Sequence, residues 1–162
     1  PSELEEFLGK CAQSGQCRST PIMLHYQQGG FNALHRDVSG KLFFPIQLVV
    51  TLGPSCSQNG GGGEFMLVDE GPGKKSTTNI ATGIGDAVLF CTSHRLAKVG
   101  GIYGLQAVQH GLSEVLKGER YAVGIPFHDY AGASEAGSSL RNYCIAPHPR
   151  AGECLQAMDW NL

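Results

Sequence analysis

The sequence predicts an all-β fold, a double-stranded β-helix (jelly roll) of about eight strands with a short N-terminal helix. Three observations predict it. Short apolar runs recur along the chain and are separated by turn residues, among them 23 glycines. Apolar residues make up 41% of the 162 residues, which is enough for the core of one domain. No segment after the N-terminal helix shows convincing helical periodicity.

The first element expected is a helix over residues 2–12. Ser2 can cap its first turn, Glu5 stands where a capping box has its acid, and three apolar residues form one stripe. Gly15 is expected to end it.

Strands follow, and Gly29-Gly30 is expected to join the first two as a hairpin. Residues 53–63 have the composition of a flexible loop, and a polar loop is expected from Thr92 to Gly104. The expected strands cover residues 22–27, 31–37, 45–52, 64–68, 77–82, 86–92, 105–110 and 120–127.

This pattern divides the chain into three parts. Residues 1–20 are a helix and lead-in, and residues 21–129 are the jelly-roll domain. Residues 130–162 are a linker and tail, in which Trp160 is a candidate to pack back onto the domain.

Composition excludes several classes of protein. The net charge is −2 and no basic block stands out, which argues against tight binding to duplex nucleic acid. The six cysteines form no Cys-x-x-Cys pair, so a structural zinc site is not expected. We interpret them as free thiols of an intracellular protein, cytoplasmic or nuclear. No apolar run suggests a membrane partner, and the oligomeric state is not specified.

The strongest chemical signal is His35-x-Asp37 within a predicted strand. Side chains two residues apart on a strand point to the same face, so an imidazole and a carboxylate lie side by side. With one distant histidine they would form the two-histidine, one-carboxylate triad that holds non-haem Fe(II) and leaves positions open for substrate and O₂.

His110 is the best candidate for the third ligand, because Arg120 follows it by ten residues. An oxoacid cosubstrate such as 2-oxoglutarate chelates iron at one end and needs a cationic fork for its far carboxylate. An arginine on the next strand supplies that fork. Tyr26 could donate a hydrogen bond to the same carboxylate. Neither His94 nor His128 has an arginine at this offset.

These residues resemble the signature of the Fe(II)- and 2-oxoglutarate-dependent dioxygenases. More closely, the chain from Leu4 to Asp129 resembles a branch grouped with the AlkB-like nucleic-acid oxygenases. The closer resemblance is carried by Tyr26-Gln-Gln-Gly-Gly-Phe-Asn-Ala-Leu-His35-Arg-Asp37, Phe44-Pro-Ile-Gln47, Gly-Gly-Glu64-Phe, Gly85-Asp86-Ala-Val, His94-Arg95 and Gly-Ile-Pro-Phe127-His-Asp129.

The resemblance implies Fe(II), O₂ and 2-oxoglutarate, with oxidative demethylation of a base in single-stranded or damaged nucleic acid. It also places His94-Arg95 near the mouth of the site, although a solvated loop pair fits them equally well. Asn32 and Gln47 are weaker candidates to touch substrate or cosubstrate.

The sequence departs from the AlkB pattern at several points. Leu24 stands where those enzymes have an asparagine, and Pro126 where they have a second arginine. Those enzymes also carry a nucleotide-recognition lid before the barrel, where this sequence has one short helix. Two alternatives therefore stay open. One is a hydroxylase of a protein side chain (prolyl-hydroxylase-like) or of a small molecule, and the other is a cupin-like metal-binding module without turnover.

Overall fold

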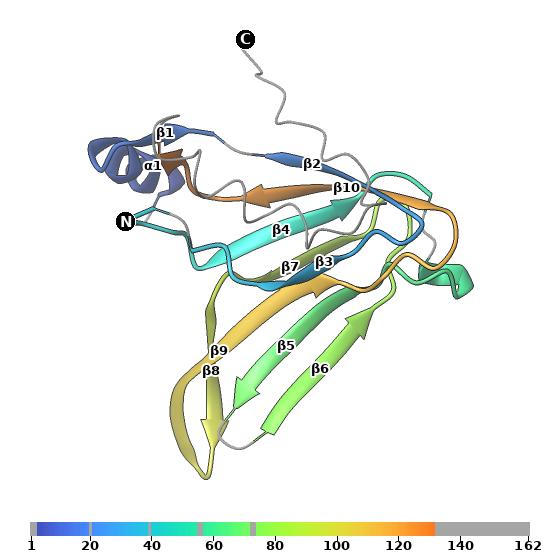
Figure 1. Ribbon diagram of the computed structural model, residues 1–162. Coiled ribbons are helices and arrows are strands. Elements are labelled where there is room, and N and C mark those ends of the chain that lie inside the picture. Colours follow the sequence, from blue (N-terminus) through green and yellow to red (C-terminus); the bar gives the residue numbers. More distant parts are fainter. Residues whose placement is uncertain (1–2, 20, 39, 55–56, 72–73, 132–162) are drawn as a thin grey trace.

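Two antiparallel β-sheets pack against each other, with one helix at the N-terminal end (Figure 1). The computed structural model describes residues 3–19, 21–38, 40–54, 57–71 and 74–131. The first sheet has the order β2 (Ile22–Gln27), β10 (Glu119–Pro126), β4 (Ile46–Thr51) and β7 (Ala87–Cys91). The second has the order β3 (Asn32–His35), β9 (Ile102–Leu112), β5 (Phe65–Gly71) and β6 (Lys74–Ile80), and β8 (His94–Val99) also pairs with β9. The predicted all-β jelly-roll core is confirmed.

The core lies between the two sheets. Phe65 of the second sheet packs with Val49, Phe90 and Ala122 of the first, and each is at most 8% exposed. The rings of Phe65 and Phe90 meet at 4.8 Å between centroids. Alternation along β4 and β10 directs every second side chain into this space, which fixes which residues face the interior.

The Gly29-Gly30 turn does not form the predicted hairpin. β2 pairs with β10 and β3 pairs with β9, so the turn carries the chain from one sheet to the other. The Gly29 N–H donates to the carbonyl of Val115 at 2.8 Å, and the Val115 N–H donates to Gly30 at 2.9 Å. Gly29 has φ 83°, which favours glycine. The turn is therefore anchored on a third segment rather than across a two-strand ladder.

The polar loop predicted between Thr92 and Gly104 is wrong. This segment contains β8 and the first residues of β9, which form a hairpin reaching away from the rest of the sheet (Figure 1). The turn is Gly100-Gly101, with φ 60° and 88°. Leu96 and Leu105 face each other across the hairpin and are 65% and 77% exposed. Such solvated strands lack the inside–outside alternation by which strands are predicted.

Helix α1 (Leu4–Gln13) begins after Glu3, which has no side-chain capping bond. The predicted cap, Ser2, lies outside the described residues. Phe7 packs edge-on against Phe44 at 5.3 Å between ring centroids, which fastens the helix to the domain. Cys11 is fully buried.

The lead-in is joined to the far end of the domain. A short strand, β1 (Gln16–Arg18), follows the helix and pairs with β11 (Tyr130–Ala131). The loop 53–63 contains one 3₁₀ turn, η1 (Ser57–Asn59). The tail after residue 131, with Trp160, lies outside the described residues, so the proposed linker stays a prediction.

None of the described helices is long and apolar enough to cross a membrane. Of the cysteines in the described part, Cys11, Cys17 and Cys91 are free thiols, as expected.

Candidate metal centre

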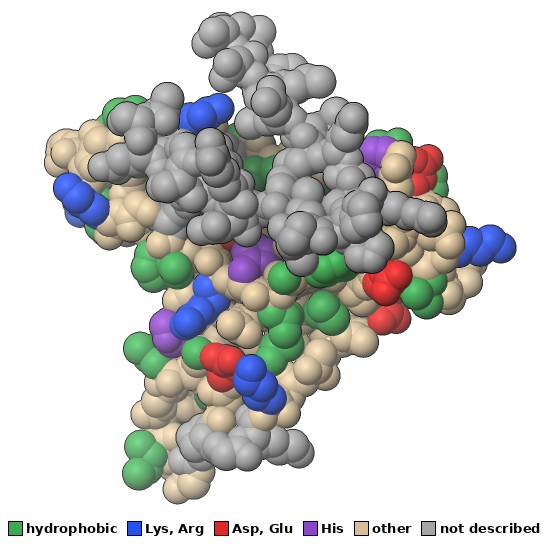
Figure 2. Space-filling model, viewed as in Figure 1, with side chains coloured by type: hydrophobic (Ala, Val, Ile, Leu, Met, Phe, Trp, Pro, Cys, Tyr) green, Lys and Arg blue, Asp and Glu red, His purple; other side chains and the backbone are tan. Residues whose placement is uncertain are grey.

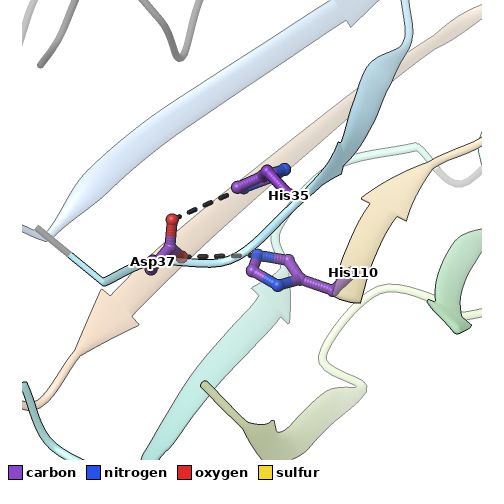
Figure 3. A group of neighbouring side chains, drawn as sticks. All are labelled: His35, Asp37 and His110. Atoms are coloured by element: carbon purple, nitrogen blue, oxygen red, sulfur yellow. Dashed lines mark ion pairs between the residues drawn. The ribbon is translucent and has the colours of Figure 1, made fainter. Parts of the chain in front are cut away.

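The structure brings His35, Asp37 and His110 together (Figure 3). His35 is the last residue of β3 and lies directly opposite His110 in the β3–β9 ladder. Asp37 follows two residues later, beyond the end of the strand rather than within it as predicted. Gly111 allows this close approach, because a Cβ there would lie 2.7 Å from the carbonyl oxygen of Asn32.

The spacing of the three side chains fits one metal ion. Asp37 Oδ1 lies 3.5 Å from His35 Nε2, and Asp37 Oδ2 lies 3.3 Å from His110 Nε2. One candidate ligand atom from each residue lies within 4.8 Å of the other two. Two ligands about 2.1 Å from one ion and at right angles are about 3 Å apart, so small adjustments suffice.

The hydrogen bonding of His35 prepares it to bind a metal. Its Nδ1 lies 2.7 Å from the carbonyl oxygen of Ala33, an arrangement in which Nδ1–H donates and Nε2 keeps its lone pair. Burial, followed by the nearby His110, lowers the pKa of His35. The imidazole is therefore held neutral, as a metal ligand must be.

The surroundings of His110 are largely apolar. Its side chain is 8% exposed, and its ring lies 4.7 Å from the ring of Phe90 and 6.0 Å from that of Phe65. Besides His35 and Asp37, a polar neighbour is Gln47, whose Nε2 lies 3.3 Å from His110 Nε2. Nonpolar walls strengthen electrostatic interactions at this centre, because they exclude water.

A second group of polar residues surrounds Arg120, which is 1% exposed. Arg120 lies directly opposite Tyr26 in the β2–β10 ladder, so both side chains project on the same face. The guanidinium donates from Nη1 to Thr82 Oγ1 at 2.8 Å, and Thr82 Oγ1 lies 2.8 Å from Thr51 Oγ1.

Tyr26 connects this group with the metal centre. Burial raises the pKa of Tyr26 to about 12, against the opposing effects of the Arg120 charge and a hydrogen bond with Asn32. The Asp37 carboxylate acts on the same hydroxyl. Asn32, predicted as a contact of substrate or cosubstrate, thus lies beside Tyr26.

His94 and Arg95 lie on β8 rather than in a loop. Arg95 pairs with Gln106 and shares the sheet face of His110, whereas His94 pairs with Ala107 and points to the opposite face. Arg95 donates from Nε to Asp69 Oδ1 at 2.6 Å. The structure therefore brings Arg95, and not His94, to the face that carries the metal centre.

Sequence reasoning assigned no role to two buried residues near these groups. His128 is 2% exposed, and its Nδ1 accepts the Phe44 N–H at 3.3 Å. Burial lowers the pKa of His128, and Asp37 is the charge that opposes this shift. Thr82 supports Arg120. Neither residue has a distinctive spacing, although His128 stands within one of the stretches that carry the resemblance.

Comparison with known proteins identifies the family of this chain. Residues 1–130 match a family described as an oxygenase catalysing oxidative methylation of damaged DNA. Two uncharacterized proteins of Mycobacterium tuberculosis, MT2286 and Rv2227, are 40% identical over 133 residues, which is 81% of this chain. The chain spans only 56% of the length of these relatives. No solved structure matches.

Proposed function

The chain belongs to this family of oxygenases, and from that premise we propose that it is an Fe(II)- and 2-oxoglutarate-dependent dioxygenase. The observation that carries the proposal is that His35 and Asp37, from the end of β3, meet His110 of β9. The reaction proposed is hydroxylation of a C–H bond, with a methylated nucleic-acid base as the substrate.

Fe(II) suits the donor set, because two imidazoles and one carboxylate on one side of an ion leave positions open on the other. Here His35, Asp37 and His110 would be the ligands. When bound, the iron and the oxoacid supply the oxidising chemistry, with O₂ consumed and 2-oxoglutarate converted to succinate and CO₂. The chain's own residues orient the reactants and exclude water.

Arg120 and Tyr26 are proposed to hold the far carboxylate of 2-oxoglutarate. A buried guanidinium can make two parallel charge-assisted bonds to a carboxylate. The raised pKa of Tyr26, to about 12, keeps its hydroxyl protonated and therefore able to donate to that carboxylate. Thr82 fixes one nitrogen of the guanidinium and so orients the fork.

Demethylation follows from oxygenase chemistry. An oxygenase adds oxygen to a methyl C–H bond. The resulting N-hydroxymethyl group loses formaldehyde when its C–N bond breaks and its hydroxyl proton passes to the nitrogen. We therefore propose removal of a methyl group from damaged DNA.

The surface favours a partner held by a few contacts. Lys and Arg side chains are scattered over the face in Figure 2 rather than gathered into a basic patch. With a net charge of −2, this favours single-stranded or damaged nucleic acid over tight duplex binding. Arg95, which lies on the sheet face that carries the metal centre, is a proposed substrate contact. We also propose an intracellular location, cytoplasmic or nuclear, because the family is described as acting on damaged DNA.

The test is production of succinate from 2-oxoglutarate by the Fe(II)-loaded protein, with and without methylated single-stranded oligonucleotides. We expect Asp37→Ala and His110→Ala to abolish it, and formaldehyde to appear with a methylated strand only. Succinate production retained by Asp37→Ala would overturn the ligand assignment.

The negative net charge also favours a second candidate, a hydroxylase of a protein side chain or a small molecule. Succinate production stimulated by a proline-containing peptide, without formaldehyde from oligonucleotides, would support it. Metal binding with no succinate under any condition would instead indicate a cupin-like module without turnover.

A further inference from the structure

Gln47 is a buried polar residue that stands at the metal centre without being a candidate ligand. It lies on β4, opposite Pro126 of β10 and Phe90 of β7, and is 3% exposed. Its side chain crosses from the first sheet to the second, where its Nε2 lies 3.3 Å from His110 Nε2. A buried amide is placed here among aromatic rings, although an apolar residue would pack with them at lower desolvation cost.

Two contacts make incompatible demands on His110 Nε2. With its Nε2 turned towards His110, the Gln47 amide donates, so the ring nitrogen must present its lone pair to it. The Asp37 carboxylate only accepts, and its Oδ2, at 3.3 Å, requires a proton on the same nitrogen. One nitrogen cannot meet both demands while the amide is turned this way; with the amide turned over, its oxygen accepts, and one proton on Nε2 serves both contacts.

A cation between His110 and Asp37 removes this conflict. The lone pair of Nε2 then points to the cation, and the carboxylate becomes a ligand of the same ion. The Gln47 amide loses His110 as its acceptor, whichever way the amide group is turned, because a metal-bound Nε2 has neither a free lone pair nor a proton. Its N–H groups then need an oxygen acceptor beside the metal.

We propose that Gln47 is a binding residue for the oxoacid, donating a hydrogen bond to the carboxylate at its metal-chelating end. The inference rests on the proposed function and extends it. Arg120 and Tyr26 recognise the far carboxylate, and Gln47 recognises the near one. The buried amide is neutral, so it recognises a chelating oxygen without adding a charge to the centre.

The experiment compares Gln47→Leu and Gln47→Glu with the parent protein. The first variant removes the donor at similar volume, and the second replaces it with an acceptor that repels a carboxylate. Gln109→Leu is the matched control, because Gln109 is next to His110 on the opposite face of β9. Mn(II) affinity is measured by electron paramagnetic resonance. Affinity of the Mn(II)-loaded proteins for 2-oxoglutarate and for 2-oxobutyrate is measured by calorimetry.

We expect Gln47→Leu to bind Mn(II) within about threefold of the parent, and to bind 2-oxoglutarate at least about tenfold more weakly. Gln47→Glu should bind 2-oxoglutarate more weakly still, and Gln109→Leu should bind both Mn(II) and 2-oxoglutarate as the parent does. The loss should be equal for 2-oxobutyrate, which lacks the far carboxylate.

Parent-like oxoacid affinity in Gln47→Leu would overturn this inference and leave the proposed function intact. A loss confined to 2-oxoglutarate would also overturn it, because the contact would then be with the far carboxylate. A parent protein that binds Mn(II) and no oxoacid would overturn the proposed function, and this inference with it.

Discussion

Replacing Arg120 by methionine should separate oxoacid binding from metal binding. Arg120 is 1% exposed, so its bonds to a carboxylate are made without competition from water. A hydrogen bond to a charged group contributes about 1.5–3 kcal/mol, and the guanidinium fork makes two. Arg120→Met should therefore weaken 2-oxoglutarate binding by about 3–6 kcal/mol, or roughly 10²–10⁴-fold in Kd. Arg120→Lys keeps the charge but loses the two-pronged guanidinium, so its affinity for 2-oxoglutarate should lie between those of the parent and Arg120→Met.

The assay is calorimetric titration of the Mn(II)-loaded proteins, with thermal unfolding to check that each variant folds. Lys98→Met is the matched control, because Lys98 is an exposed cation on β8 that lies over the ring of Tyr103, and this variant should bind the oxoacid as the parent does. The loss of affinity in Arg120→Met should vanish with 2-oxobutyrate, which has no far carboxylate. Equal affinity of the parent and Arg120→Met for 2-oxoglutarate, with both folded, would refute the proposed role.

Three further predictions concern stability. The pKa values of His35 and His128 are lowered in the folded protein, so below pH 6.5 the unfolded chain binds more protons than the folded chain. The free energy of unfolding of the metal-free protein should therefore be highest above pH 6.5. Below pH 6.5 the free energy of unfolding, measured by urea titration, should fall by up to about 1.4 kcal/mol per pH unit per histidine. The slope should be shallower in His128→Gln. A free energy of unfolding that does not change over this range would contradict the argument. Gly111→Ala should lower the free energy of unfolding by about 1–3 kcal/mol, because its Cβ would lie 2.7 Å from the Asn32 oxygen, and Gly104→Ala, with nothing within 4 Å, should cost much less. Mn(II) should raise the melting temperature in proportion to the logarithm of its concentration, and an equal rise in Asp37→Ala would place the ion elsewhere.

The sequence was informative where chemistry and burial coincide. The interior strands were predicted because they alternate or run continuously apolar, as in β4 and β10. The group of His35, Asp37 and His110 was predicted from spacing and from the chemistry that spacing allows. The structure brings the three side chains together, and their role as ligands stays a prediction.

The sequence was misleading where partners are distant or solvent replaces packing. The turn at Gly29 has the local signature of a hairpin, but its hydrogen bonds go to Val115, which no local pattern reveals. The β8–β9 hairpin exposes Leu96 and Leu105, so neither face shows the periodicity of a strand. Thr82 stands in no motif, and the role of His128, although it stands within one of the stretches that carry the resemblance, depends on tertiary packing.

The most direct test of the account is a crystal structure of the protein with Mn(II) and N-oxalylglycine. Anomalous scattering should show one ion bound by His35 Nε2, an Asp37 oxygen and His110 Nε2, with the far carboxylate of the ligand on Arg120. An ion bound elsewhere, with the three side chains free of metal, would contradict it.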